Sequence, residues 1–287
     1  MNEHHFARPR NYQQPFNWWG YRASPERPLT ITELISQGTL DDQLAAFLWV
    51  VMEERATIIV AATPQEAGKT TMLTALLDFL PEGIEQIYLR GWYERFEFLE
   101  EDRDPTATYL LSNEISSHLP IYMWGRGVRR MFEAASEGYG FGATVHAASA
   151  AEVIHMLENY PLEVPQQLLT EIDLVLTMTY RPGVKKPLRR VMRLELIENA
   201  GQVPAPRILA SRDVIGTELQ SSPGTLINAL VRQFGMERED ATSRLARRSS
   251  ALTKMVRSET FAPEDVHRAI KRFRSSASAS RSSESGR

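Results

Sequence analysis

The sequence predicts an α/β fold with a largely parallel sheet, followed by a small C-terminal helical subdomain. Ala56–Ala62 (ATIIVAA) is a compact, β-branched run of the kind found in buried parallel strands. The segment GKTTMLTALLDFL follows it directly and is typical of an amphipathic helix. Later strand candidates alternate with helical segments, and this alternation is the pattern of a parallel sheet covered by helices.

The remaining elements are predicted from hydrophobic spacing and turn residues. Apolar residues three and four apart predict a helix over Leu40–Glu54. Gly235 and Pro263 are placed as the C-cap of one C-terminal helix and the first turn of the next. The further strand candidates are Glu85–Gly91, Gly142–Ala147 and a hairpin formed by Glu171–Arg181 and Arg189–Glu198.

These elements divide the chain of 287 residues into four parts. Residues 1–28 are predicted to form an irregular arm whose clustered aromatic side chains pack on another part of the protein. Residues 29–212 form the α/β core, and residues 213–274 form the helical subdomain. Residues 275–287 (SSASASRSSESGR) have low complexity and are predicted to be disordered.

The bulk composition excludes several classes of function. The chain has no cysteine, which excludes disulfides, thiol catalysis and cysteine-bound zinc and fits a cytoplasmic protein. A net charge of −3 gives no overall electrostatic reason to expect nucleic-acid binding. The N-terminus lacks the apolar core of a signal peptide. The longest apolar run, Leu44–Met52, is shorter than the roughly 20 residues of a membrane-spanning helix.

The most informative motif is AATPQEAGKTT, at Ala61–Thr71. Its second half resembles the end of a phosphate-binding loop, and it stands between a buried strand and a helix, as such a loop must. Backbone amides at the start of the helix would bind phosphate groups. We expect Lys69 to contact the terminal phosphates and Thr70 to bind Mg²⁺ through its hydroxyl group. The predicted phosphate-binding residues are Ala67, Gly68, Lys69, Thr70 and Thr71.

The first half of the motif departs from the phosphate-loop pattern. Thr63 stands where the pattern G-x-x-x-x-G-K-[ST] has its first glycine. A left-handed backbone costs an ordinary residue about 1–2 kcal/mol, and Pro64 favours an extended Thr63. We therefore expect this loop to differ in shape from the standard one and to bind nucleotide more weakly or not at all.

A hydrolytic site also needs a carboxylate at the end of a neighbouring strand, and two alignments compete for it. In the first, Thr106–Glu114 is the strand, Glu114 is the acid, and residues 92–102 form a helical crossover. In the second, a helix capped by Asp104 and Pro105 runs to about Ser117, and PIYMWG is the strand. Arg126 then stands at the acid's position and the site is inactive. We favour the first alignment.

His146 is the third candidate, because it follows the strand that Gly142–Ala147 predicts. In that position a histidine could sense the terminal phosphate or hydrogen-bond across the site. Two other clusters, the acidic run Glu94–Asp104 and the arginines Arg126, Arg129 and Arg130, fit solvated surfaces at least as well as a metal site or arginine fingers.

Taken in order, these segments resemble the secretion-superfamily ATPases, the RecA-like motors of type II secretion, type IV pili, type IV secretion and archaeal flagella. The resemblance looks closest to the archaeal-type branch. Residues 27–81 are similar to that family's lead-in helix, strand and phosphate loop. Residues 132–157 are similar to its histidine box, and residues 171–198 to its closing hairpin. The resemblance covers most of residues 28–274.

The resemblance implies a RecA-like P-loop NTPase core that binds ATP and Mg²⁺ and works within a hexameric ring. It also implies a location in the cytoplasm, peripheral to the inner face of the cell membrane, with a membrane platform protein as partner. Protein secretion or pilus assembly is the implied process. Nucleic acid is not an expected partner.

The chain departs from this family at several positions besides Thr63. Gly91 and Trp92 occupy the places of an acidic pair, and Glu94 is only a loose substitute. Asn113 stands where family members usually have glycine before the acid. The large N-terminal domain has no counterpart here. Two functions therefore remain open: a motor ATPase with weak or atypical hydrolysis, and a non-catalytic structural or regulatory partner with a degenerate nucleotide site.

Overall fold

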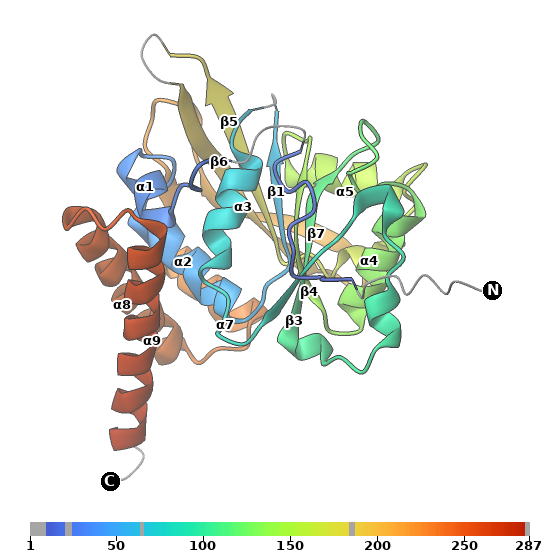
Figure 1. The fold of residues 1–287 in the computed structure, drawn as a ribbon. Coiled ribbons are helices and arrows are strands. Elements are labelled where there is room, and N and C mark those ends of the chain that lie inside the picture. Colours follow the sequence, from blue (N-terminus) through green and yellow to red (C-terminus); the bar gives the residue numbers. More distant parts are fainter. Residues whose placement is uncertain (1–9, 21–24, 64–65, 184–186, 285–287) are drawn as a thin grey trace.

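A mixed sheet flanked by helices forms the centre of the protein in the computed structural model, which describes residues 10–20, 25–63, 66–183 and 187–284 (Figure 1). Within these residues the sheet has eight strands in the order β2-β3-β4-β1-β5-β6-β7-β8. The neighbouring strands β2, β3, β4, β1 and β5 pair in parallel. Strands β6, β7 and β8 continue the sheet beyond β5 with antiparallel pairing. The predicted α/β fold with a largely parallel sheet is confirmed. The strands are β1 (Ile58–Ala62), β2 (Glu85–Tyr88), β3 (Thr108–Ile115), β4 (Gly140–Val145), β5 (Leu174–Arg181), β6 (Leu188–Asn199), β7 (Pro204–Ser211) and β8 (Gln220–Ser221).

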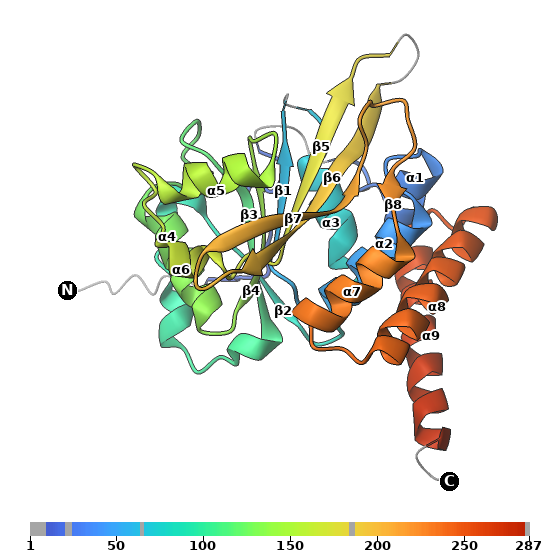
Figure 2. The same ribbon diagram turned by 180° about the vertical axis from the view of Figure 1, so that it is seen from behind.

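The helices are distributed over both faces of the sheet (Figures 1 and 2). None of the helices in the described residues combines the length and the hydropathy that crossing a membrane requires. The α-helices are α1 (Ile31–Ser36), α2 (Asp42–Glu53), α3 (Lys69–Leu77), α4 (Arg126–Ser136), α5 (Ala150–Glu158), α6 (Gln166–Leu169), α7 (Pro223–Gln233), α8 (Arg238–Arg257) and α9 (Pro263–Glu284), and three 3-10 helices span Gly91–Tyr93, Glu97–Glu100 and Pro105–Ala107.

Strand β1 is buried on both faces and divides the hydrophobic core into two clusters. Ile58, Val60 and Ala62 pack in one cluster with α2, α3 and the C-terminal helices. Ile59 and Ala61 point the other way and pack in a second cluster with α4 and α5. A strand buried on both sides needs the continuous apolar sequence that Ala56–Ala62 has.

The C-terminal helices do not have a core of their own. Leu226, Leu252 and Ile270, one from each of α7, α8 and α9, belong to the same hydrophobic cluster as β1 and α2. Strand β8 lies within residues 213–274 and pairs with β7, so the sheet extends into the predicted helical subdomain. The helices thus act as a covering layer of the α/β core.

Two local predictions are wrong. Residues 92–102 do not form one helix between β2 and β3; the structure has two short 3-10 helices there, and Trp92 is 53% exposed. Residues 275–284 continue α9, although the sequence predicts disorder for residues 275–287. This extension is physically reasonable, because adding residues to an existing helix needs no new nucleation and the segment has no proline or glycine before Gly286.

Several other predictions agree with the structure. Helix α7 ends at Gln233 and Gly235 follows with φ of +64°, the left-handed conformation expected just beyond a C-terminus. Pro263 begins α9. Strands β5 and β6 form the predicted antiparallel pair; the turn between them includes residues 184–186, which lie outside the described residues.

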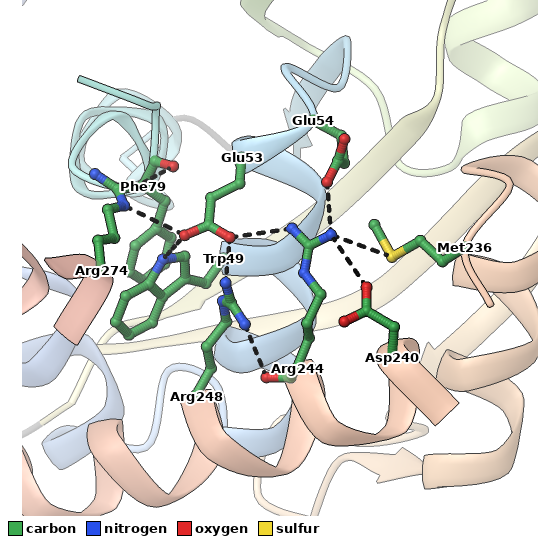
Figure 3. Close-up of polar contacts among 9 residues, drawn as sticks. All are labelled: Trp49, Glu53, Glu54, Phe79, Met236, Asp240, Arg244, Arg248 and Arg274. Carbon is green, nitrogen blue, oxygen red and sulfur yellow. Dashed lines mark hydrogen bonds and ion pairs between the residues drawn. The ribbon is translucent and has the colours of Figure 1, made fainter. Parts of the chain in front are cut away.

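A buried group of charges attaches α8 and α9 to α2 (Figure 3). The carboxylate of Glu53 lies at its centre and is 12% exposed. It accepts hydrogen bonds from the Trp49 indole at 2.9 Å, from Arg244 at 3.2 Å and from Arg274 at 3.2 Å, and it also pairs with Arg248. Because three arginines share one carboxylate, removing it would leave buried positive charge without its partner.

We therefore expect Glu53→Ala to lower the free energy of unfolding by about 3–5 kcal/mol, the usual cost of breaking a buried ion pair from one side. Urea denaturation followed by circular dichroism measures this change. Glu54→Ala is the matched control, because Glu54 is 40% exposed and pairs with Arg244 alone among the contacts described. A surface pair of this kind contributes about 0–1 kcal/mol. Equal losses in the two variants would contradict the central role of Glu53.

A second buried acid, Asp173, lies at the amino-terminal ends of the parallel strands. The predicted site lies at their carboxyl ends. Asp173 precedes β5 and accepts a hydrogen bond from the Thr57 amide at 2.8 Å, which ties the start of β1 to β5. Burial raises the pKa of Asp173 to about 6, although the hydrogen bonds from Thr57 and Gln233 oppose this increase. The folded protein therefore holds this proton at pH values where the unfolded chain, with a pKa near 3.8, has lost it.

This difference predicts how stability depends on pH. The contribution of Asp173 is complete below about pH 4 and is lost as the pH rises through about 6, because the folded state binds more protons in that window. Asp173→Asn keeps an oxygen acceptor and should remove the decline, raising the free energy of unfolding at pH 7.5 by up to about 3 kcal/mol relative to wild type. Urea titrations at pH 4.5 and 7.5 test this, with the exposed Asp102→Asn as control. If Asp173→Asn loses as much unfolding free energy between pH 4.5 and pH 7.5 as the wild type does, the assigned role of Asp173 is contradicted.

Candidate phosphate-binding site

The predicted phosphate loop connects β1 to α3 at the carboxyl edge of the sheet. Gly68 is the N-cap of α3 and has φ of +92° and ψ of +25°, a left-handed conformation that favours glycine. A Cβ atom at this position would also lie 3.1 Å from Cδ of Arg189. The backbone conformation therefore favours glycine, and any side chain here would also require Arg189 to shift slightly. The amide groups at the N-terminus of α3 are available to an anion in the adjoining cavity.

The first half of the loop has an unusual backbone conformation at Glu66, three residues after the position of the missing glycine, Thr63. Thr63 is exposed, and residues 64–65 lie outside the described residues. Glu66 takes a left-handed conformation with φ of +72°, which costs a residue other than glycine about 1–2 kcal/mol. Its carbonyl oxygen accepts a hydrogen bond from Nε of Arg189 at 2.8 Å. A side chain of the β5–β6 hairpin therefore supports the loop where the sequence has no glycine.

The structure agrees with the first of the two alignments for the acid. Strand β3 covers Thr108–Ile115, so Glu114 lies near the carboxyl end of a parallel strand. Residues 120–125 form no extended strand; Met123 makes an isolated bridge to Ile115, and Arg126 begins α4. Glu114 is thus the residue placed beside the phosphate loop.

Lys69, Glu114 and His146 converge although three different segments supply them. The Nζ atom of Lys69 lies 3.6 Å from Oε2 of Glu114 and 3.4 Å from Nε2 of His146. The same Nε2 atom lies 3.2 Å from Oε1 of Glu114. Nε2 can donate to the carboxylate or accept from the ammonium group, but one tautomer cannot do both.

The charge of Glu114 follows from this arrangement. Burial alone would raise its pKa, but the hydrogen bond with His146 and the positive charge of Lys69 outweigh burial and lower the pKa below its usual value. Glu114 is therefore ionised at neutral pH. An ionised carboxylate beside a phosphate site can orient a water molecule or bind a divalent cation.

These side chains face a cavity of about 840 Å³. Its volume is within the range of small-molecule sites. Its polar side comes from the phosphate loop and the carboxyl ends of β3 and β4. Its other side comes largely from residues before α2, including the N-terminal arm. The residues that line it include Trp18, Trp19, Glu66, Ala67, Gly68, Lys69, Thr70, Thr71, Asn113, Glu114, His146 and Arg189.

The residues present fit a magnesium nucleotide. A hydroxyl group from Thr70 and a carboxylate from Glu114 line the same cavity, and oxygen atoms of this kind are the ligands that Mg²⁺ prefers. The lysine and the α3 amides suit phosphate groups. Thr70 would hold the ion, and the ion would offset charge on the phosphates.

The other candidate clusters have structural roles. Glu94 lies with its carboxylate against the Arg10 guanidinium at 2.7 and 2.8 Å, and it also accepts the Arg90 amide. It is not among the residues that line the cavity, so it does not replace the missing acidic pair. Arg129 and Arg130 are on the exposed face of α4 and pair with Glu133.

Comparisons with known proteins give distant similarities. No protein-family model matches the sequence. Two curated relatives are uncharacterized proteins of Methanocaldococcus jannaschii. MJ0900 is 28% identical over 190 residues, which are 60% of this chain and 34% of the relative. MJ1287 is 26% identical over 162 residues, which are 50% of this chain and 59% of the relative. The matched region thus spans about a third of one relative and less than two thirds of the other.

Two solved structures are similar in fold. The VirB11 ATPase from the Brucella suis type IV secretion system, in complex with sulphate, has 18% identity and a TM-score of 0.37 over 72% of this chain and 63% of its own. The Legionella pneumophila ATPase DotB has 12% identity and a TM-score of 0.40 over 87% of this chain and 67% of its own. Both likenesses concern the fold alone.

Several residues complete the site from distant parts of the chain, and no local sequence pattern identifies them. Arg189 is more than 120 positions from Glu66 along the chain, and no local pattern predicts their contact. Asn113 was noted only as a departure from a family pattern. The paired tryptophans Trp18 and Trp19 were visible as an aromatic cluster in a polar arm, but that signal gave no location for them.

If the loop binds phosphate, Lys69→Ala should weaken ATP binding at least tenfold, because a hydrogen bond to a charged group contributes about 1.5–3 kcal/mol. Titration with a fluorescent ATP analogue in the presence of Mg²⁺ measures the affinity. Lys254→Ala is the control, since Lys254 is exposed on α8 and does not line the cavity. Equal affinities for wild type and Lys69→Ala would rule out the phosphate-loop interpretation.

Proposed function

We propose that this protein is an ATP·Mg²⁺-binding motor ATPase subunit of the secretion and pilus type, with weak or atypical hydrolysis. The observation that carries the proposal is the convergence of Lys69, Glu114 and His146 within 3.2–3.6 Å of one another, beside the N-terminus of α3. A cation, an ionised acid and a histidine around one cavity support this proposal, because phosphoryl transfer to water depends on charge stabilisation and on a group that orients the water.

Each residue has a distinct role in this proposal. The backbone amides of Ala67–Thr71 bind the phosphates. Lys69 moves away from Glu114, and its ammonium group offsets the negative charge of the terminal phosphate. Once Lys69 has moved, the Glu114 carboxylate is free to accept a proton from the attacking water or to orient it. His146 keeps its contact with Glu114 and holds the carboxylate toward the cavity, so that it couples the acid to β4.

The wider role follows from the resemblance of the sequence to secretion ATPases. We propose a homo- or hetero-hexamer in the cytoplasm, at the inner face of the membrane, that acts on a platform protein of a secretion or pilus machine. A neighbouring subunit could supply positive charge that this site lacks, and the exposed arginines of α4 are chemically suited to that task.

The second candidate is a non-catalytic structural or regulatory partner with the same fold. Two observations favour it: the phosphate loop needs Arg189 to support a left-handed Glu66, and Glu94 is held by Arg10 away from the cavity. A protein of this kind would bind nucleotide weakly or not at all and would not turn it over.

Glu114→Gln separates the two candidates. In a motor ATPase this change should keep ATP affinity within about threefold, because the glutamine has the same shape, and reduce turnover by about 100-fold, the usual contribution of a general base. Phosphate release measures turnover, and the exposed Glu100→Gln is the control. ATP binding with a turnover at background level in both wild type and Glu114→Gln would favour the non-catalytic partner.

A further inference from the structure

Two adjacent residues of the N-terminal arm are bonded to opposite sides of the proposed nucleotide site. The arm runs past the outer strand β2, where the amide of Tyr88 donates to the carbonyl oxygen of Tyr12 at 3.0 Å. It then reaches the cavity at Asn17 and Trp18. Asn17 has φ of +47°, a left-handed turn that asparagine tolerates, and its carbonyl oxygen also accepts the amide of Gly20 at 2.8 Å.

Trp18 is bonded to the helix that carries the phosphate loop. Its indole Nε1 donates to Oγ1 of Thr74 at 2.8 Å, and the Thr74 hydroxyl donates to the carbonyl oxygen of Thr70 at 2.7 Å. Trp18 is 6% exposed and packs edge-on against Tyr88, with ring centroids 5.2 Å apart. A short chain of hydrogen bonds therefore leads from the arm to the proposed magnesium ligand.

Asn17 is bonded to the strand that carries the acid. Its carbonyl oxygen accepts a hydrogen bond from Nδ2 of Asn113 at 2.9 Å, and Oδ1 of Asn113 accepts the amide of Glu114 at 2.8 Å. The carbonyl oxygen of Asn113 also accepts the Thr144 hydroxyl at 2.6 Å, two residues before His146. Asn113 is 4% exposed, so these bonds lie in a buried position where leaving them unmade is costly.

We propose that Asn17 and Trp18 form a clamp that fixes the phosphate-loop helix α3 relative to the acid-bearing strand β3, with Asn113 as its positioning residue; the inference rests on the proposed function. Strand β4 separates β3 from β1, so the sheet sets the position of Glu114 relative to Thr70 only indirectly. The arm connects them directly. Hydrolysis depends on that relative position more strongly than nucleotide binding does, because a small misplacement of a catalytic group has a large effect on rate.

Trp18→Phe tests the clamp with the least disturbance, since it keeps an aromatic ring and removes the indole N–H. We expect kcat to fall about tenfold while ATP affinity stays within about threefold, and Asn113→Ala should behave alike. In the double variant Trp18→Phe/Asn113→Ala, kcat should fall no further than in the more affected single variant. The reason is that releasing either end of the clamp already removes its effect. Trp92→Phe, outside the cavity, is the control. Losses that multiply, or affinity that falls together with kcat, would overturn the proposal.

Hydrogen exchange of the full wild-type chain, with and without ATP·Mg²⁺, gives a readout that needs no turnover. We expect nucleotide to slow hydrogen exchange in residues 66–74, at the Gly20 amide of the arm, and at the Glu114 amide of β3. Slowing in residues 66–74 without any change in the arm would overturn the clamp and leave the nucleotide site intact. No change in either segment would overturn both the clamp and the proposed ATP binding.

Discussion

The site depends on the parallel pairing of β1 with β4 and β5. Ala61, near the carboxyl end of β1, is in register with Val145 on one side and Thr177 on the other. Because parallel strands end at the same edge, this register places His146 next to the start of the phosphate loop. The pairing of Ile115 with Val145 then places Glu114 one strand further along. The backbone hydrogen bonds of the sheet thus bring His146 and Glu114, which are 77 and 45 positions away from Lys69, to the same edge.

This constraint explains which features could be predicted from the sequence. The residue composition of β1, β4, β5 and β6 is nearly sufficient to predict these segments as strands. The phosphate loop and His146 can then be located, because they directly follow predicted strands. Contacts such as Arg189 with Glu66 and Asn113 with Asn17 could not be predicted, because they join segments about 100 residues apart and have no local pattern. The aromatic spacing of the residues before β3 predicts a helix, but the structure has short 3-10 helices there.

Buried charges are used in two different ways in this fold. Around Glu53, several short hydrogen bonds share one carboxylate and connect three helices, so that no partner can leave without stranding another charge. The Lys69 ammonium lies 3.6 Å from Glu114, farther than any of the arginines lies from Glu53, and an open cavity adjoins this pair. Lys69 can therefore exchange its carboxylate partner for a phosphate group at little cost. The first arrangement is suited to holding helices together and the second to binding a ligand.

Two positions where the chain departs from the secretion-ATPase pattern, Glu94 and Asn113, are bonded to the N-terminal arm. The resemblance places an acid at position 91, but a Cβ atom there would lie 2.3 Å from the backbone of Ile121, so only glycine fits. Glu94, the nearest substitute, is held by Arg10 of the arm. Asn113, in place of the expected glycine, binds Asn17 of the same arm. The arm that binds Glu94 therefore also provides, through Asn17 and Asn113, hydrogen bonds that lead to the remaining acid, Glu114. If this coupling operates, these substitutions form a rebuilt site in which arm and acid depend on each other, and the arm cannot be removed without changing the chemistry.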